Sequence, residues 1–174
     1  KLGLFSKFLI GARWFFFKDG LGATNHFESC AFIRSKAGRK SPDIQYHFVP
    51  AVLEDHGRES VKGHGYSCHA CVLRPHSKGT VRLNDTDPQS APAIDPNFLD
   101  DDRDIATLRA GVRHMKRILE TPPLTDFKPT DRHPINIDSD EELDALIRNR
   151  ADTVYHPVGT CRMGSEDDAV VDAR

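Results

Sequence analysis

The sequence predicts an α+β fold in which helices pack on one face of a mostly antiparallel sheet. Short segments rich in β-branched and aromatic residues fill the first half of the 174 residues, and the two clearest helical patterns follow in the second half. Strands that precede helices, rather than alternate with them, are typical of this class. With 38% hydrophobic and 29% charged residues, the composition is that of an ordinary globular protein. We expect residues 1–174 to form a single domain.

The charge balance gives no sign of a nucleic-acid partner. The formal net charge is −2, so the chain lacks the basic field that attracts phosphate backbones or anionic lipids. The most apolar run, residues 8–17, is interrupted by Arg13 and is shorter than the about 20 apolar residues of a membrane-spanning helix. No secretory signal pattern opens the chain. The residues themselves therefore indicate neither a membrane-spanning helix nor a secretory signal.

The first strands are expected on either side of a polar turn. Residues 26–33 and 44–50 are rich in β-branched and aromatic side chains, which favours strands. Residues 38–42 between them are polar and contain glycine and proline, which indicates a turn. Residues 54–63 are charged and contain glycine, so we expect an exposed loop.

A hairpin is expected next along the chain. Residues 65–74 predict a longer strand, and residues 80–84 alternate apolar and polar side chains after a turn at 75–79. This pattern predicts that the two segments pair, with one face in solvent. Residues 85–96 contain three prolines, which favours an irregular crossing segment.

Two helices are expected in the second half. Residues 100–120 carry apolar side chains at spacings of three and four, and acidic residues crowd the start, where the helix dipole favours them. Pro122 and Pro123 end this helix. The second helix begins at Ser139, with Glu142 in the position of a capping box. The expected apolar positions of the two helices are Ile105, Leu108, Val112, Met115 and Leu119, then Leu143, Leu146 and Ile147.

The segment 155–164, Tyr-His-Pro-Val-Gly-Thr-Cys-Arg-Met-Gly, is the most informative one for chemistry. His156 is followed by Pro157 and Gly159, so the backbone there turns sharply and can approach a ligand closely. The spacing alone is equally compatible with a structural turn and with a loop-borne site.

This segment resembles the C-terminal signature of the glucose-methanol-choline (GMC) oxidoreductases. Residues 25–35, 42–48, 74–83 and 95–99 are similar, in the same order, to further segments of that family, most closely to its choline dehydrogenase branch. The similarity covers nearly the whole chain from about Gly20. It implies the substrate-binding domain of an FAD-dependent alcohol oxidoreductase. By the same analogy we expect an intracellular enzyme that is cytoplasmic or peripherally membrane-associated.

The resemblance also implies roles for single residues. In the family, flavin accepts a hydride from the alcohol carbon while a histidine takes the hydroxyl proton, and His156 matches that histidine. Imidazole suits this task because its ordinary pKa is about 6.5. With His156, residues Pro157, Gly159 and Thr160 match the stretch that lies against the flavin.

His47 matches a position that lines the substrate pocket of choline-oxidising relatives, although a strand histidine can equally face solvent or core. Glu28 could offer a carboxylate to a quaternary ammonium group such as that of choline. Nearby aromatic rings could add cation–π contacts, or could be plain core residues. These rings are Phe27, Phe32, Tyr46 and Phe48. Other small primary alcohols are the alternative substrates.

The family's flavin-binding half is not recognisable in this sequence. No Gly-x-Gly-x-x-Gly turn occurs, and the run from Gly20 to Asn25 lacks the third glycine. We therefore expect FAD to be bound mainly by residues outside this chain, and the chain alone to be inactive. It opens without methionine and has no terminating feature, so both ends look cut. It is expected to reach the start of the flavin-contacting segment at about 155–174.

A metal-binding module is the alternative from another class. Five possible ligands crowd one stretch, namely His64, Cys68, His69, Cys71 and His76. In a strand, however, positions 68 and 71 point to opposite faces, which opposes joint ligation of zinc. We therefore expect no metal site and four reduced cysteines.

Overall fold

The computed structural model describes residues 3–52, 54, 61, 63–172 and 174. The loop expected at residues 54–63 lies mostly outside these described residues. The elements in chain order are α1 (Leu4–Phe17), the 3-10 helix η1 (Gly20–Gly22), β1 (Ser29–Ile33), β2 (Ile44–Val49), β3 (Ser67–Val72), β4 (Thr80–Arg82), β5 (Ala93–Asp95), α2 (Asp102–Leu119), the 3-10 helix η3 (Leu124–Phe127) and α3 (Asp140–Arg150).

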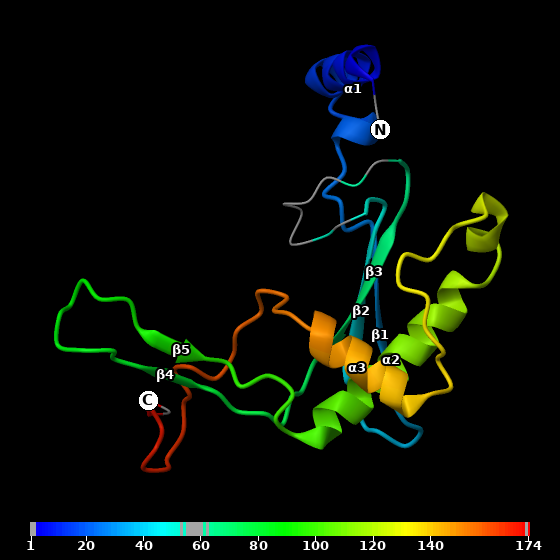
Figure 1. The fold of residues 1–174 in the computed structure, drawn as a ribbon. Helices are drawn as coiled ribbons and strands as arrows, with labels where there is room; N and C mark the ends of the chain where they lie inside the picture. Colours follow the sequence, from blue (N-terminus) through cyan, green and yellow to red (C-terminus); the bar gives the residue numbers. More distant parts are fainter. Residues whose placement is uncertain (1–2, 53, 55–60, 62, 173) are drawn as a thin grey trace.

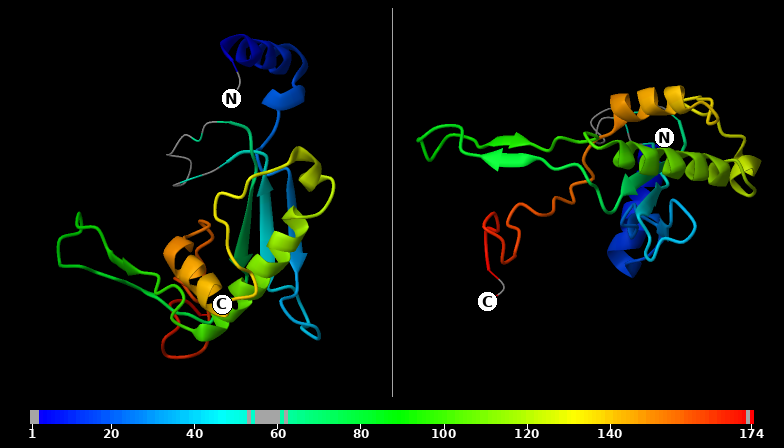
Figure 2. Two further views of the ribbon diagram at one scale, coloured as in Figure 1. Left: turned by 45° about the vertical axis from the view of Figure 1, so that its right-hand side comes forward. Right: turned by 90° about the horizontal axis from the view of Figure 1, so that it is seen from below.

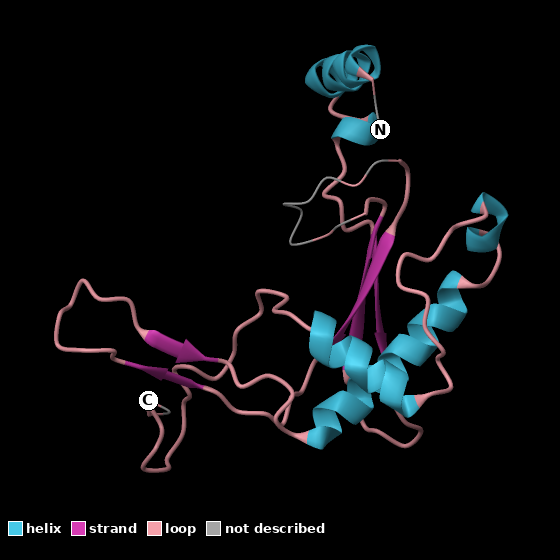
Figure 3. Cartoon of the chain, in the orientation of Figure 1, coloured by secondary structure: helices cyan, strands magenta, loops and turns pink. Residues whose placement is uncertain are grey.

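A three-stranded antiparallel sheet in the order β1-β2-β3 forms the centre of the fold (Figure 1). The strands expected at 26–33, 44–50 and 65–74 are thereby confirmed, each somewhat shorter than expected. The register pairs Cys30 with His47 and His47 with His69, so these three side chains form one row across the sheet. Helix α2 packs on β2 and β3, and α3 packs on α2 (Figure 3).

The strand alternation gives the sheet two different faces. Ile44 and Tyr46 are buried on the face toward α2, and the Tyr46 hydroxyl donates a hydrogen bond of 2.8 Å to the Gly111 carbonyl. A β-carbon at Gly111 would lie only 3.2 Å from Ile44 Cδ1, so the missing side chain lets the helix approach the strand closely. The buried core therefore lies between β2 and α2.

The other face, which we call the open face, mixes polar and apolar side chains and is partly exposed. By alternation it carries Cys30, Phe32, Gln45, His47, Val49, Ser67, His69 and Cys71, of which Val49 is buried. Cys30 and His69 are exposed, and Phe32 keeps 55% of its surface accessible. The open face is the part of the sheet available to a ligand.

Both predicted helices are confirmed. The capping of α3 differs from the expected capping box in the partner of Glu142. The Asp101 carboxylate accepts from the Arg103 backbone N–H (2.9 Å) at the start of α2. The Ser139 hydroxyl accepts from the Glu142 N–H (3.2 Å) at the start of α3. The Glu142 carboxylate accepts from the Asn136 N–H (3.3 Å), so it ties down the incoming loop.

The expected pairing of residues 65–74 with residues 80–84 is wrong. Strand β4 pairs instead with β5, and this hairpin extends away from the main sheet (Figure 2). The segment expected to be irregular thus holds a strand, which fits between Pro92 and Pro96. A β-carbon at Gly79 would overlap the Asp95 carbonyl. Glycine at this position therefore permits the close approach of the segment before β4 to the end of β5.

The chain turns away from β3 because Asp104 of α2 holds the residues that follow the strand. Its carboxylate accepts from the backbone N–H groups of His76 (2.8 Å) and Ser77 (2.9 Å) and from the Ser77 hydroxyl (2.6 Å). Asp104 is only 3% exposed. Burial alone would raise the pKa of Asp104, but these hydrogen bonds outweigh burial and hold the pKa below its ordinary value.

Helix α1 lies beyond the end of the sheet, next to η1 (Figure 1). Its apolar side chains are exposed on several sides, for example Leu4 at 88% and Phe16 at 74%. A helix that is apolar all round is normally covered in a folded protein. No helix within the described residues combines the length and the apolar character needed to cross a membrane.

We expect Asp104→Asn to lower the free energy of unfolding by about 1–3 kcal/mol at pH 7, because the amide cannot satisfy the same three donors. A carboxyl group with a lowered folded-state pKa stabilises the fold above its unfolded pKa of about 3.9, and this contribution is lost as the pH falls through the folded value. Urea unfolding at pH 7 and at progressively lower pH should therefore show the difference shrinking. Asp102→Asn, whose side chain is 99% exposed on the same helical turn, is the matched control. A deficit that persists unchanged in acid would contradict this account.

Candidate active site

The structure brings two of the sequence-predicted site residues together at the open face. His47 lies in the middle of β2, and His156 belongs to the segment that follows α3. Their imidazole rings are 5.9 Å apart between centroids and cross at 71°. Residues 109 positions apart thus meet in one place.

His47 occupies a half-buried position between two rings. Phe27 presents an edge to it with centroids 5.9 Å apart, on the approach to β1. Its Nδ1 atom is buried and has no hydrogen-bond partner among the described residues. A buried polar atom without a partner is costly, and such atoms are often satisfied by a ligand or an ordered water.

The surroundings keep the His47 ring uncharged. Burial is the main reason that the pKa of His47 lies below its ordinary value of 6.5, and the nearby charge of His156 lowers it further. At neutral pH His47 is therefore a neutral imidazole. In that form one ring nitrogen donates a hydrogen bond and the other accepts one.

The segment around His156 turns sharply and is largely uncovered. Tyr155 and Gly159 have left-handed φ angles of 60° and 84°, and the Tyr155 N–H donates to the Thr153 hydroxyl (3.0 Å). No heavy atom outside the neighbouring residues lies within 4 Å of a β-carbon placed on Gly159. Pro157, Gly159 and Thr160 are all exposed. The stretch thus presents free surface beside the two histidines.

Glu28 is engaged differently from its expected role. Its carboxylate accepts a hydrogen bond from the Thr24 hydroxyl in the segment before β1. The side chain is exposed, and the residues next to it in sequence include Phe27, which touches His47. Glu28 thus bonds to Thr24 and directly follows Phe27, the residue whose ring packs against His47.

The four aromatic rings do not gather into one cage. Tyr46 is buried on the face toward α2, and its ring stacks on His114 with centroids 5.9 Å apart. Phe48 lies on that same side by alternation and packs against Tyr66 at 5.5 Å. Phe27 and Phe32 remain on the side of His47. Because neighbouring strand residues point in opposite directions, Tyr46 and Phe48 lie on the other side of the sheet from His47.

The strand geometry also bears on the cysteine–histidine cluster. Cys68 lies opposite Phe48 and Cys71 opposite Gln45, so the two thiols point to opposite faces as alternation predicts. Burial raises the pKa of the Cys68 thiol to about 11. Within the described residues no group of three or more His, Cys, Asp or Glu side chains is arranged to hold a metal ion.

His69 is the site residue that the sequence analysis missed, because it was considered only as a zinc ligand. The register places it directly opposite His47 on the open face. The signal was present in the sequence as two strand histidines, but only the register shows that they are neighbours.

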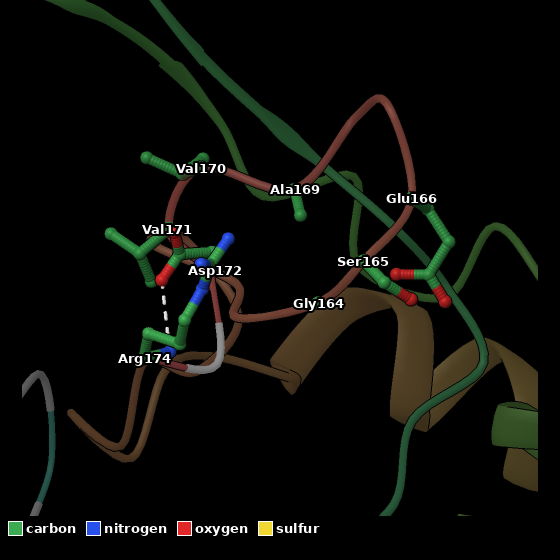
Figure 4. A pocket seen from close by; sticks show the side chains of 8 residues that line it. All are labelled: Gly164, Ser165, Glu166, Ala169, Val170, Val171, Asp172 and Arg174. Carbon is green, nitrogen blue, oxygen red and sulfur yellow. Dashed lines mark hydrogen bonds between the residues drawn. The ribbon is translucent and has the colours of Figure 1, made fainter.

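Surface hollows also lie elsewhere among the described residues, and two of them are well defined. One, of about 470 Å³, is formed by the C-terminal residues alone (Figure 4). Its walls are joined by the hydrogen bond from the Gly164 N–H to the Val171 carbonyl (3.0 Å). The other, of about 340 Å³, lies between the end of β1 and α2 and is lined by Arg34, Arg113 and Arg117 among others. Neither includes His47 or His156.

The comparisons with known proteins agree with the fold. Residues 75–174 match the sequence model of the family described as GMC oxidoreductase. The chain therefore belongs to the GMC oxidoreductases.

More particular similarities follow within that family. The chain is 46% identical over 169 residues to an oxygen-dependent choline dehydrogenase of Photobacterium profundum, covering 97% of this chain and 30% of that protein. It is 43% identical over 175 residues to the protein of that name from Vibrio vulnificus, covering 99% and 31%. The chain thus spans about a third of the length of the curated relatives it matches.

Solved structures show the same fold. Pyridoxine 4-oxidase from Mesorbium loti superposes with a TM-score of 0.70 at 28% identity, over 85% of this chain and 30% of that one. A formate oxidase superposes with a TM-score of 0.80 over 99% of this chain and 35% of that one, and its 22% identity supports the fold alone.

We expect the His47 pKa, measured by NMR titration of labelled histidines in the folded protein, to lie below 6.5. In His156→Gln it should rise only slightly, because burial is the larger cause. Since the folded state then binds fewer protons than the unfolded state, stability should fall as the pH drops from about 6.5 toward the folded pKa. A His47 pKa at or above 6.5 would contradict the neutral ring inferred here.

Proposed function

We propose that this chain is the substrate-binding part of an FAD-dependent alcohol oxidoreductase, and that the intact enzyme oxidises choline to betaine aldehyde. The observation that carries the proposal is the meeting of His47 and His156 beside the open face of the sheet, with a buried ring nitrogen on His47 left unpartnered. Membership of the GMC family and similarity to proteins named choline dehydrogenase support it.

The residues beside His156 fit the proposed cofactor. Pro157, Gly159 and Thr160 form an exposed turn with no side chain over Gly159, which leaves room for a flat ring system. FAD, when bound, supplies the acceptor for the hydride that leaves the alcohol carbon. The rest of the cofactor would be held mainly by residues outside this chain.

In this proposal His156 takes the proton of the alcohol hydroxyl. Loss of that proton leaves the electron pair on oxygen, which forms the carbonyl as the hydride departs from carbon. His156 is exposed on the side of the open face, so a substrate there can reach it. His47, as a neutral ring 5.9 Å away between centroids, can hydrogen-bond to the same oxygen and orient it.

The choice of choline depends on how a permanent cation would be held. Glu28 is exposed and directly follows Phe27, whose ring packs against His47. The four aromatic rings are divided between two faces of the sheet, so they do not form a complete cage around an ammonium group. Another small primary alcohol is therefore the second candidate substrate. A metal-binding module is not proposed, because Cys68 and Cys71 point to opposite faces.

For His156→Ala in the intact enzyme, we expect the rate of flavin reduction by the alcohol to fall by about 10²–10⁴-fold, because the proton acceptor is lost. The substrate dissociation constant should change little. Anaerobic stopped-flow absorbance separates the two quantities. His76→Ala removes an exposed imidazole in the turn after β3 and serves as the control. A defect confined to substrate binding would count against the assigned role.

For Glu28→Gln in the intact enzyme, we expect the KM for choline to rise by about tenfold, equivalent to about 1.4 kcal/mol of lost charge interaction. The KM for 3,3-dimethylbutan-1-ol, an uncharged alcohol of the same shape, should stay the same because Glu28 does not meet a charge there. Steady-state kinetics on both alcohols test this. Equal changes for the two would remove Glu28 from the cation site.

A further inference from the structure

His69, on β3, lies next to the pair formed by His47 and His156. It is paired directly with His47 across β2 and β3, and side chains opposite each other in an antiparallel pair have β-carbons about 5 Å apart. Its imidazole is exposed on the open face. His47 thus has His156 on one contact and His69 as its strand partner, on the face along which the substrate is proposed to lie.

The three strands carry no other basic group and no acidic group. None of the residues of β1, β2 and β3 is Asp, Glu, Lys or Arg. Among the described residues, His156 reaches this face from another segment, with its ring 5.9 Å from that of His47 between centroids. Of the side chains on the three strands, only those of His47 and His69 can carry a positive charge beside the proposed reacting centre.

We propose that His69 is a specificity-determining residue that forms, with His47, an uncharged polar wall for the non-reacting end of the alcohol. The inference rests on the proposed function and deepens it. His156 takes the hydroxyl end of a short alcohol, so the other end extends along the face toward His69. A cationic ammonium group there requires a wall without positive charge.

The surroundings of His69 support a neutral ring. Partial burial of the ring is the main reason that the pKa of His69 is lowered, and the positive charge that a protonated His47 would carry lowers it further. His47 is in turn held neutral by burial and by His156. Neighbouring imidazoles oppose one another's protonation because like charges repel.

The test places a charge at position 69 of the intact flavoenzyme and compares choline with 3,3-dimethylbutan-1-ol. His69→Lys should raise the ratio of KM for choline to KM for the uncharged alcohol by at least about tenfold, because a fixed cation meets the ammonium group. His69→Glu should lower that ratio, and His69→Gln should leave it near the wild-type value. Gln89→Lys adds the same charge in the exposed loop between β4 and β5 and should leave the ratio unchanged.

The opposite signs expected for Lys and Glu separate the inference from damage to folding, which would affect both alcohols alike. If His69→Lys fails to bind flavin, His69→Glu alone decides the matter. A ratio that does not respond to the charge at position 69, in an enzyme that oxidises choline, overturns the inference and leaves the proposed function standing. A wild-type enzyme that does not oxidise choline overturns both.

Discussion

The antiparallel register of β1, β2 and β3 is the constraint on which the other features depend. A shift of one residue would move every side chain of a strand to the other face. In the observed register Ile44 and Tyr46 turn toward α2 and form the core, while His47 turns the other way. The same pairing that buries the core thus sets an imidazole row on the open face, where His156 meets it.

Two buried carboxylates hold the ends of this sheet in place. Asp43 accepts hydrogen bonds from the backbone N–H (2.7 Å) and the hydroxyl (2.6 Å) of Ser35, which fixes the connection between β1 and β2. Asp104 does the same for the residues after β3. Each carboxylate replaces backbone pairing at a point where the chain leaves the sheet. They help to keep the strands in register.

Patterns local in sequence were sufficient to predict the three strands, α2 and α3, because alternation, helical spacing and capping residues act over a few positions. Pairing was harder to predict. Residues 80–82 pair with 93–95 because Gly79 admits the Asp95 carbonyl and Asp104 draws the chain away from β3, and both effects depend on distant residues. Likewise His156 was found through a motif, whereas the place of His69 beside His47 required the register.

The central claim is that the open face of the sheet is the substrate side of a flavin site. A crystal structure of the intact protein with FAD and an unreactive choline analogue tests it most directly. The account predicts that the His47 and His156 rings face one cavity that holds both the analogue and the flavin ring. An analogue bound on the α2 side of the sheet, or an open face filled by other parts of the polypeptide, would contradict it.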